Sequence, residues 1–311
     1  MTATATHPGL SPAAAARMPR HDRETTARRL LASAAKTSYD PQKDIDWTEP
    51  LEEGLFGLTP EWSSLYGTHL WDQMSEEQRI RLTELEFCSI SGVGIWFEMI
   101  LMQMVIRDIY DQDPATKHVQ FALTEIADEC RHSVMFAMTA EKFGAPSYQP
   151  TGASQELGRL FKTLAKGPDL YASILVAEEV LDIFQREVIE DERVQPLTRA
   201  VSRIHVVEEA RHMRFARDEI ARRAATMSTR ERLLQRGVLS IVANVIIHNL
   251  VQPEVYAACG LDVKEATRAA RANEHYTAKL THAAKGLTSF LEDVRLIGGP
   301  SRRLWTRARL I

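Results

Sequence analysis

Two stretches of sequence decide the fold: Asp128-Glu129-Cys130-Arg131-His132 and, 80 residues later, Glu208-Glu209-Ala210-Arg211-His212. Each contains the pattern Glu-x-x-His, with an acidic residue directly before the Glu and an Arg directly before the His. Residues three apart in an α-helix project from nearly the same face, one turn apart. Each stretch can therefore present a carboxylate and an imidazole together, which predicts two long helices that share one polar centre.

The flanking sequence is rich in helix boundaries and poor in strand patterns. Capping-box patterns begin at Ser75 and Ser228, and a Pro follows the predicted helix start at Asp113-Pro114, Gly167-Pro168 and Gln195-Pro196. These signals predict five long helices that begin near residues 76, 114, 168, 196 and 229. A sixth is predicted from Asp262 toward Glu292, and Gly298-Gly299-Pro300 is expected to end regular structure before a basic tail.

Long helices with short connections predict an all-α antiparallel helical bundle with additional N- and C-terminal helices. Residues 1–21 lack periodicity and are predicted to form a disordered tail, whereas residues 22–311 are predicted to form a single domain. Within that domain we expect a helix over residues 25–38 and an irregular arm over residues 39–60. The sequence has no Gly-rich phosphate loop and no Gly-x-Ser-x-Gly, which argues against Rossmann, P-loop and α/β-hydrolase folds.

The composition narrows the function classes. A net charge of -4 argues against a nucleic-acid binder that works through a basic face. The three cysteines, Cys88, Cys130 and Cys259, have no close spacing, which argues against a disulfide scaffold and favours the cytoplasm. Cys88 and Cys130 are expected to be buried small hydrophobes. We expect no transmembrane segment, because the longest apolar candidate, residues 238–251, is short and contains polar residues.

Two other predicted helices contribute candidate carboxylates. Glu98 is the only charged residue between Glu86 and Arg107, and a lone carboxylate in an apolar stretch is costly unless it is paired or metal-bound. In the third long helix, either Glu178 or Glu179 could point inward. One Glu from each of two helices plus Glu-x-x-His from each of the other two is the pattern of di-iron and di-manganese carboxylate bundles.

His205 adds a further imidazole to this pattern, because it precedes Glu209 by four residues and His212 by seven and so shares their helical face. Imidazole and carboxylate together suit iron. Each feature also has a structural alternative. His205 alone is more often a core or surface histidine, and Glu178-Glu179 and Glu208-Glu209 could be solvated faces. Met99, Met102 and Met104 are expected to pack in the core. The joint pattern favours a dimetal site.

With these residues the chain resembles the para-aminobenzoate N-oxygenase family of non-heme di-iron oxygenases. Members have a ferritin-like helical bundle and oxidise arylamines through hydroxylamine and nitroso stages to nitro compounds. The likeness covers roughly residues 76–220. Its most specific feature is His205, one turn before the second Glu-x-x-His. Val176-Ala177-Glu178 matches the third-helix ligand of the family, and Glu98 matches the first-helix ligand, with Glu86 as the alternative.

The resemblance implies a ferritin-like fold and two Fe ions, with Mn as a substitute. The implied ligands are Glu98, Glu129, His132, Glu178, His205, Glu209 and His212. One iron would take Glu98, Glu129 and His132, and the other Glu178, His205 and His212. Glu129 and Glu209 would bridge the irons or lie between them, and Asp128 and Glu208 would hold imidazole N–H groups.

The resemblance further implies that the chain activates O2 as a co-substrate and oxidises a small molecule, in the first place an arylamine. An external electron donor is required, because the sequence has no flavin or NAD motif. A homodimer is the oligomeric state to be tested.

Several other functions compete with this reading. A radical-generating ribonucleotide reductase subunit usually has a tyrosine four residues after the first motif's His, where this chain has Phe136. A ferroxidase or iron-storage protein, a di-iron hydroxylase of a non-amine substrate, and a metal-free helical interaction protein are the remaining alternatives.

Overall fold

The computed structural model describes residues 22–165 and 167–311, and within these residues the structure is all-α, as predicted. The β pairing that it records there is an isolated bridge between Phe56 and Val194. The disordered tail predicted for residues 1–21 lies outside the described residues.

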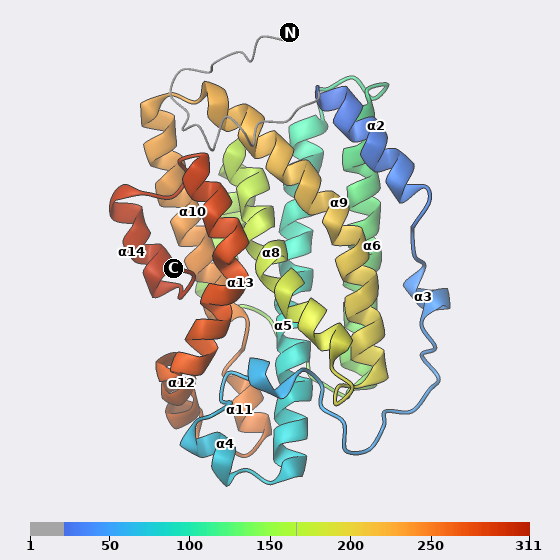
Figure 1. The fold of residues 1–311 in the computed structure, drawn as a ribbon, viewed down its shortest axis with the longest axis vertical. Helices are drawn as coiled ribbons and strands as arrows, with labels where there is room; N and C mark the ends of the chain where they lie inside the picture. Colours follow the sequence, from blue (N-terminus) through green and yellow to red (C-terminus); the bar gives the residue numbers. More distant parts are fainter. Residues whose placement is uncertain (1–21, 166) are drawn as a thin grey trace.

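Four long helices form the bundle: α5 (Glu76–Ile109), α6 (Lys117–Lys142), α8 (Pro168–Glu190) and α9 (Pro196–Thr226). Consecutive members α5 and α6, and then α8 and α9, run antiparallel to one another (Figure 1). The connection from α6 to α8 returns along the length of the bundle and contains α7 (Gly152–Leu164). The predicted antiparallel bundle is therefore confirmed, whereas α7 was not predicted.

The capping signals locate most of the helix starts correctly. Ser75 and Ser228 form capping boxes at the starts of α5 and α10 (Thr229–Asn249). The predicted start of α6 at Asp113-Pro114 is wrong. Thr116 is the N-cap, because its hydroxyl accepts a hydrogen bond from the backbone N–H of Val119, while the Asp113 carboxylate accepts one from Ala115 in the preceding turn.

The C-terminal part forms a further layer of α10, α11 (Glu254–Ala258), α12 (Val263–Ala272), α13 (Glu274–Asp293) and α14 (Arg302–Arg307). The predicted continuous sixth helix is wrong, because it breaks at Asn273. The side chain of Asn273 caps α13 and also donates hydrogen bonds to the backbone oxygens of Ser64 and Tyr66. Regular structure also continues beyond Gly298, since α14 inserts the fully buried ring of Trp305.

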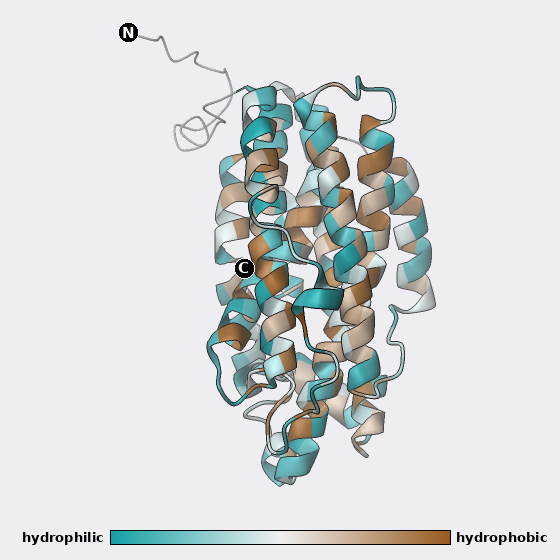
Figure 2. Cartoon of the chain, turned by 90° about the vertical axis from the view of Figure 1, so that its right-hand side faces the viewer, coloured by the Kyte–Doolittle hydropathy of each residue, from teal (hydrophilic) through white to brown (hydrophobic). Residues whose placement is uncertain are grey.

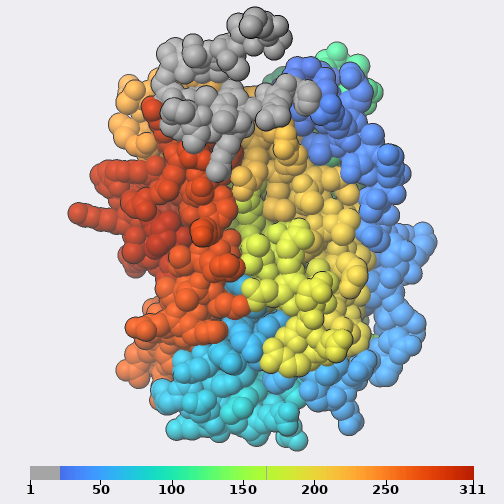
Figure 3. Space-filling model, in the orientation of Figure 1, coloured from blue at the N-terminus to red at the C-terminus, as the bar shows by residue number. Residues whose placement is uncertain are grey.

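The N-terminal segment lies along the outside of the bundle: Figure 3 shows its first part in blue at the right-hand edge and its last part in lighter blue at the lower end. It contains α2 (Arg23–Ala34), the short α3 (Pro41–Asp44) in the predicted irregular arm, η1 (Pro60–Trp62) and α4 (His69–Gln73). Arg23 at the start of α2 binds both carboxylate oxygens of Glu219 on α9, at 3.1 and 2.9 Å. The start of α2 is thereby tied to the helix that carries the second Glu-x-x-His.

The long helices carry brown apolar and teal polar segments in alternation (Figure 2). By length and composition, two segments are long and apolar enough to cross a membrane, namely Glu76–Ile109 and Thr229–Ala258. In the bundle, 56% of the most apolar 18-residue stretch of the first segment is buried, and 50% of that of the second. The absence of a transmembrane segment stays a prediction.

Two burial predictions from the sequence are wrong. Cys88 is buried as expected, but Cys130 is exposed, because it lies on the outer face of α6 beside the sulfur of Met102. Met104 packs in the core, whereas Met99 is 52% exposed.

Candidate metal centre

The seven predicted ligands converge at the middle of the bundle. Each is at most 4% exposed, and together they come from all four long helices: Glu98 from α5, Glu129 and His132 from α6, Glu178 from α8, and His205, Glu209 and His212 from α9. The alternative in which the paired glutamates form solvated faces is therefore wrong. The structure thus brings together the whole candidate set.

Two carboxylates, Glu129 and Glu209, occupy the middle of this group. Nδ1 of His132 lies 3.2 Å from Glu129 Oε2 and 3.3 Å from Glu209 Oε1. Nδ1 of His212 lies 3.3 Å from Glu129 Oε1 and 2.9 Å from Glu209 Oε1. Each carboxylate therefore faces both imidazoles, which is the central placement that the resemblance implied for Glu129 and Glu209.

The outer nitrogens of these two imidazoles are held by acids from the opposite helix. Nε2 of His132 on α6 lies 2.8 Å from Glu208 on α9, and Nε2 of His212 on α9 lies 3.2 Å from Asp128 on α6. When the outer nitrogen carries the proton, the lone pair of Nδ1 is left for a metal ion. The acids that precede each Glu in the two motifs therefore orient the histidines across the helix pair.

The arginine of each motif supports these acids. Arg131 forms an ion pair with Asp128, and Arg211 lies 3.3 Å from Asp128 and 3.5 Å from Glu208. Because Asp128 and Glu208 are almost fully buried, their negative charges need such partners. The repeated Arg is thus explained by the acids and not by the candidate ligands themselves.

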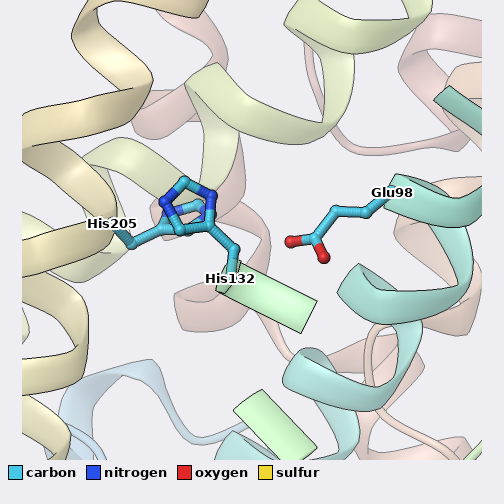
Figure 4. A group of neighbouring side chains, drawn as sticks. All are labelled: Glu98, His132 and His205. Atoms are coloured by element: carbon cyan, nitrogen blue, oxygen red, sulfur yellow. The ribbon is translucent and has the colours of Figure 1, made fainter. Parts of the chain in front are cut away.

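His205 points into the same centre. Its Nε2 lies 3.8 Å from Glu178 and 3.9 Å from Glu209, while its Nδ1 lies 2.8 Å from the side-chain oxygen of Gln185. Figure 4 shows Glu98 reaching from α5 toward the imidazoles of His132 and His205. Gln185 was missed in the sequence, although it lies seven residues after Glu178 and so on the same helical face.

The structure separates the alternatives that the sequence left open. Glu98 lies with His132 and His205, whereas the Glu86 carboxylate accepts hydrogen bonds from the backbone N–H and hydroxyl of Ser64. Glu178 faces the centre, and the adjacent Glu179 instead forms an ion pair with Arg217. Glu86 and Glu179 are therefore buried carboxylates outside the cluster.

Glu125 is a further buried carboxylate that the sequence reasoning did not select. It is fully buried on α6, and neither of its carboxylate oxygens has a hydrogen-bond partner among the described residues. One of its oxygens lies within 4.8 Å of ligand atoms of Glu129 and His212. The signal was its position four residues before Glu129, on the same helical face.

Three-residue groups that could each hold an ion share members across the cluster. They are Glu98, His132 and His205; Glu125, Glu129 and His212; Glu129, His132 and Glu209; and Glu178, His205 and Glu209. His212 groups with Glu129 and Glu125, and the division of the ligands between two irons that the resemblance implied stays a prediction. The overlapping groups are compatible with two ions placed side by side.

The donor set fits iron or manganese. Among the described residues, Oε2 of Glu209 and both oxygens of Glu125 are buried without a hydrogen-bond partner. Unpaired buried carboxylate oxygens are costly unless a cation neutralises them. Carboxylate oxygens combined with imidazole nitrogens are ligands that divalent iron and manganese accept.

When no metal is bound, protonation of its carboxyl and imidazole groups reduces the charge repulsion within the cluster. Burial, with the Glu129 charge nearby, raises the pKa of Glu98 to about 8, and burial likewise raises the pKa of Glu125 to about 8. Burial alone would lower the pKa of His132 and His212, but the surrounding carboxylates raise both well above the ordinary value. Bound cations would displace these protons, so metal binding here is expected to release protons.

A cavity of ≈ 20 Å³ adjoins Glu98, Glu178 and His205. Phenylalanine rings form much of its wall, from Phe87, Phe97, Phe136 and Phe184. The Phe136 ring lies 5.0 Å from the His205 ring, at the position where a radical-generating subunit would have tyrosine. This side of the centre is therefore apolar.

A family model described as P-aminobenzoate N-oxygenase AurF matches residues 20–295 of the chain. Uncharacterised proteins of Mycobacterium bovis and of two strains of Mycobacterium tuberculosis are each 27% identical to the chain over 214 residues. That match covers 65% of this chain and 62% of each relative, so the chain spans less than two thirds of the length of these relatives.

Proposed function

The chain belongs to the P-aminobenzoate N-oxygenase AurF family, and from that premise we propose that it is a di-iron oxygenase that uses O2 to oxidise a small organic substrate. N-oxygenation of an arylamine is the proposed reaction. The two Fe ions, replaceable by Mn, would be held by the seven residues that converge on the middle of the bundle.

One observation carries this proposal. All three histidines of the cluster have one ring nitrogen bound to an outer partner and the other directed at buried carboxylates: Glu208 holds His132, Asp128 holds His212 and Gln185 holds His205. A metal-free helical core has no need of three imidazoles oriented in this way. Partners that fix a histidine's orientation are a regular feature of metal sites.

The bound metals would supply electrons to O2, and the chain's own residues would supply orientation and a dry surrounding. Glu129 and Glu209 lie at the centre of the group, where they would hold two ions close together. Ser133 donates a hydrogen bond to Glu98 and fixes the direction of that carboxylate. The phenylalanine rings beside His205 would exclude water from the side on which substrate binds.

The apolar wall is suited to the neutral form of an aromatic amine. A protonated amine has no nitrogen lone pair to accept oxygen, and an apolar wall disfavours the charged form. Phe97 and Phe136 would contact the ring of such a substrate. Electrons would come from an external donor.

The test is metal analysis combined with a reaction screen. Protein produced with sufficient iron is expected to contain two irons per chain and to oxidise an aromatic amine when O2 and a chemical reductant are supplied. One zinc or no metal per folded chain would contradict the proposed centre. If the protein contained two irons but oxidised no arylamine, the dimetal site would be supported and the proposed N-oxygenation would be contradicted.

A further inference from the structure

Besides the cavity at the metal cluster, the structure has a pocket of ≈ 450 Å³ with a mainly apolar lining and one polar place in its wall. The pocket is formed between α7, α10, the middle of α5 and the start of α8. Its lining is mainly aliphatic and aromatic and includes Trp96, Phe97, Phe161, Val238, Val242 and Ile246. A pocket of this size, apolar with few polar groups, is typical of a small-molecule site.

Asp169 and Gln235 form the polar end of this pocket. Asp169 is 6% exposed, and its Oδ1 has no hydrogen-bond partner among the described residues; the same holds for the buried Oε1 of Gln235. Burial raises the pKa of Asp169 to about 7, and a hydrogen bond from Gln235 opposes that rise. Buried acceptors without donors are costly, so a ligand that brings a donor group would be stabilised here.

Phe97 connects this pocket with the metal cluster. This 4% exposed ring lines both the apolar pocket and the ≈ 20 Å³ cavity beside Glu98, Glu178 and His205. A cavity of that size holds about one water molecule, so an aromatic ring can enter only if a wall residue moves. Movement of the Phe97 side chain would join the two spaces.

The helix geometry sets the length of a molecule that occupies both spaces. Asp169 precedes Glu178 by nine residues within α8, which corresponds to about 13.5 Å along the helix axis. A single aromatic ring is too short to reach from the metal cluster to Asp169. A ligand that uses both ends must be elongated.

We propose that the pocket receives the far part of the substrate, and that the substrate is an elongated arylamine with an apolar extension that ends in a hydroxyl or ammonium group. The amine ring lies beside the metal cluster, the extension passes Phe97, and the terminal donor binds Asp169 and Gln235. Only the placement of the amine end rests on the proposed function. The half-exposed Leu157, Leu160 and Ile241 line the pocket and give an apolar route of entry.

Calorimetric titration of the full-length protein without O2 tests this proposal, because binding is then separated from turnover. The probes are para-aminobenzoate, para-octylaniline, and the same octylaniline with a terminal hydroxyl or a terminal amine. We expect the octyl chain to strengthen binding at least tenfold, and a terminal donor to add about another tenfold. The hydroxyl and amine probes distinguish the two kinds of donor.

Three variants locate the binding. Asp169→Asn should remove the advantage of the terminal amine and leave para-octylaniline unchanged. Ile241→Trp, at a position that is 49% exposed, should block the mouth and weaken every chain-bearing probe. Leu233→Trp is the matched control, because Leu233 is 58% exposed on the same helix but does not line the pocket.

Equal binding of all four probes would overturn the proposal, and so would unchanged binding in Ile241→Trp. A dimer that closes the mouth and excludes the chain-bearing probes would also overturn it. If the protein bound no iron but still bound the octyl-bearing probes more tightly, the pocket proposal would stand and the proposed function would be contradicted. If the protein oxidised para-aminobenzoate but bound the octyl-bearing probes no better, the proposed function would stand and the pocket proposal would be wrong.

Discussion

Glu86 and Glu98 lie on the same helix, α5, and both are almost fully buried. Burial raises the pKa of Glu86 to about 7 and that of Glu98 to about 8. Their surroundings differ. Glu86 accepts hydrogen bonds from Ser64, whose hydroxyl also bonds to Tyr256, whereas Glu98 faces His132 and His205.

The comparison teaches that burial and a raised pKa do not distinguish a structural carboxylate from a metal ligand. A lone carboxylate such as Glu86 needs no cation, because one bound proton is enough to neutralise it: Ser64 donates to its Oε1, and its Oε2 has no hydrogen-bond partner among the described residues. A carboxylate surrounded by other carboxylates and by imidazoles has acceptors in excess, and that excess calls for a cation. The following experiments test this difference, from the largest expected loss of iron to none.

The largest loss is expected for Glu209→Ala, because Glu209 lies between the imidazoles of His132 and His212. The variant should retain little of the two irons expected per chain, measured by metal analysis of the purified protein. Glu179→Ala is the matched control, since Glu179 is also buried on a bundle helix but pairs with Arg217. Equal iron content in the two variants would count against the cluster.

A smaller loss is expected for His205→Ala. Six candidate ligands and the core remain, so the fold should persist while iron occupancy and the oxidation rate of para-aminobenzoate both fall. His118→Ala is the control, because His118 is buried on α6 but stacks on Phe215 outside the cluster. It should cost about 1–3 kcal/mol of unfolding free energy and no iron. If His205→Ala behaved in the same way, the assignment of His205 as a ligand would be wrong.

A loss of about 10-fold to 100-fold in iron affinity is expected for Gln185→Leu. The variant leaves Nδ1 of His205 without its acceptor and removes no candidate ligand. Gln185→Glu keeps an acceptor at that position and should restore most of the affinity. Competition with a chelator measures both values. An unchanged affinity in Gln185→Leu would show that Gln185 does not orient His205.

No loss of iron is expected for Glu86→Gln, whose effect is on stability. The folded pKa of about 7 exceeds the ordinary value of 4.5 for a glutamate, so the folded state binds more protons than the unfolded state between these pH values. The contribution of Glu86 is therefore fully present below about pH 4.5 and is lost as the pH rises to 7, by roughly 3 kcal/mol. Denaturant unfolding from pH 4.5 to 8 should show a flatter profile for the variant. Two identical profiles would contradict this account.

The candidate ligands could be predicted because chemistry and helical spacing coincide there. Glu98 is conspicuous as a lone charge in an apolar helix, and the two Glu-x-x-His motifs are one turn long. Such signals depend on local sequence alone, whereas the choice of Glu178 over Glu179 depended on the family resemblance. The long helices were predictable for the same reason, since their capping boxes are local.

The missed elements depend on contacts between distant segments. α7 approaches α5 closely at Gly158, where a Cβ atom would lie 2.5 Å from the Trp96 ring. α14 is fixed by the burial of Trp305. Short helices are marginal without such tertiary packing. Gln185 escaped notice in a similar way, because its partner His205 lies on another helix.

The two motif helices, α6 and α9, each follow another bundle helix and carry the same Glu-x-x-His pattern. They differ at the position four residues before the Glu of that pattern. Glu125 precedes Glu129 by four residues, just as His205 precedes Glu209. Where one helix has a buried carboxylate, the other has an imidazole. Two ions bound between these helices would therefore have unequal surroundings, one richer in negative oxygen and the other richer in neutral nitrogen. We therefore expect the two ions to bind in sequence with different affinities. The second ion would bind to a cluster whose net charge the first ion has already changed.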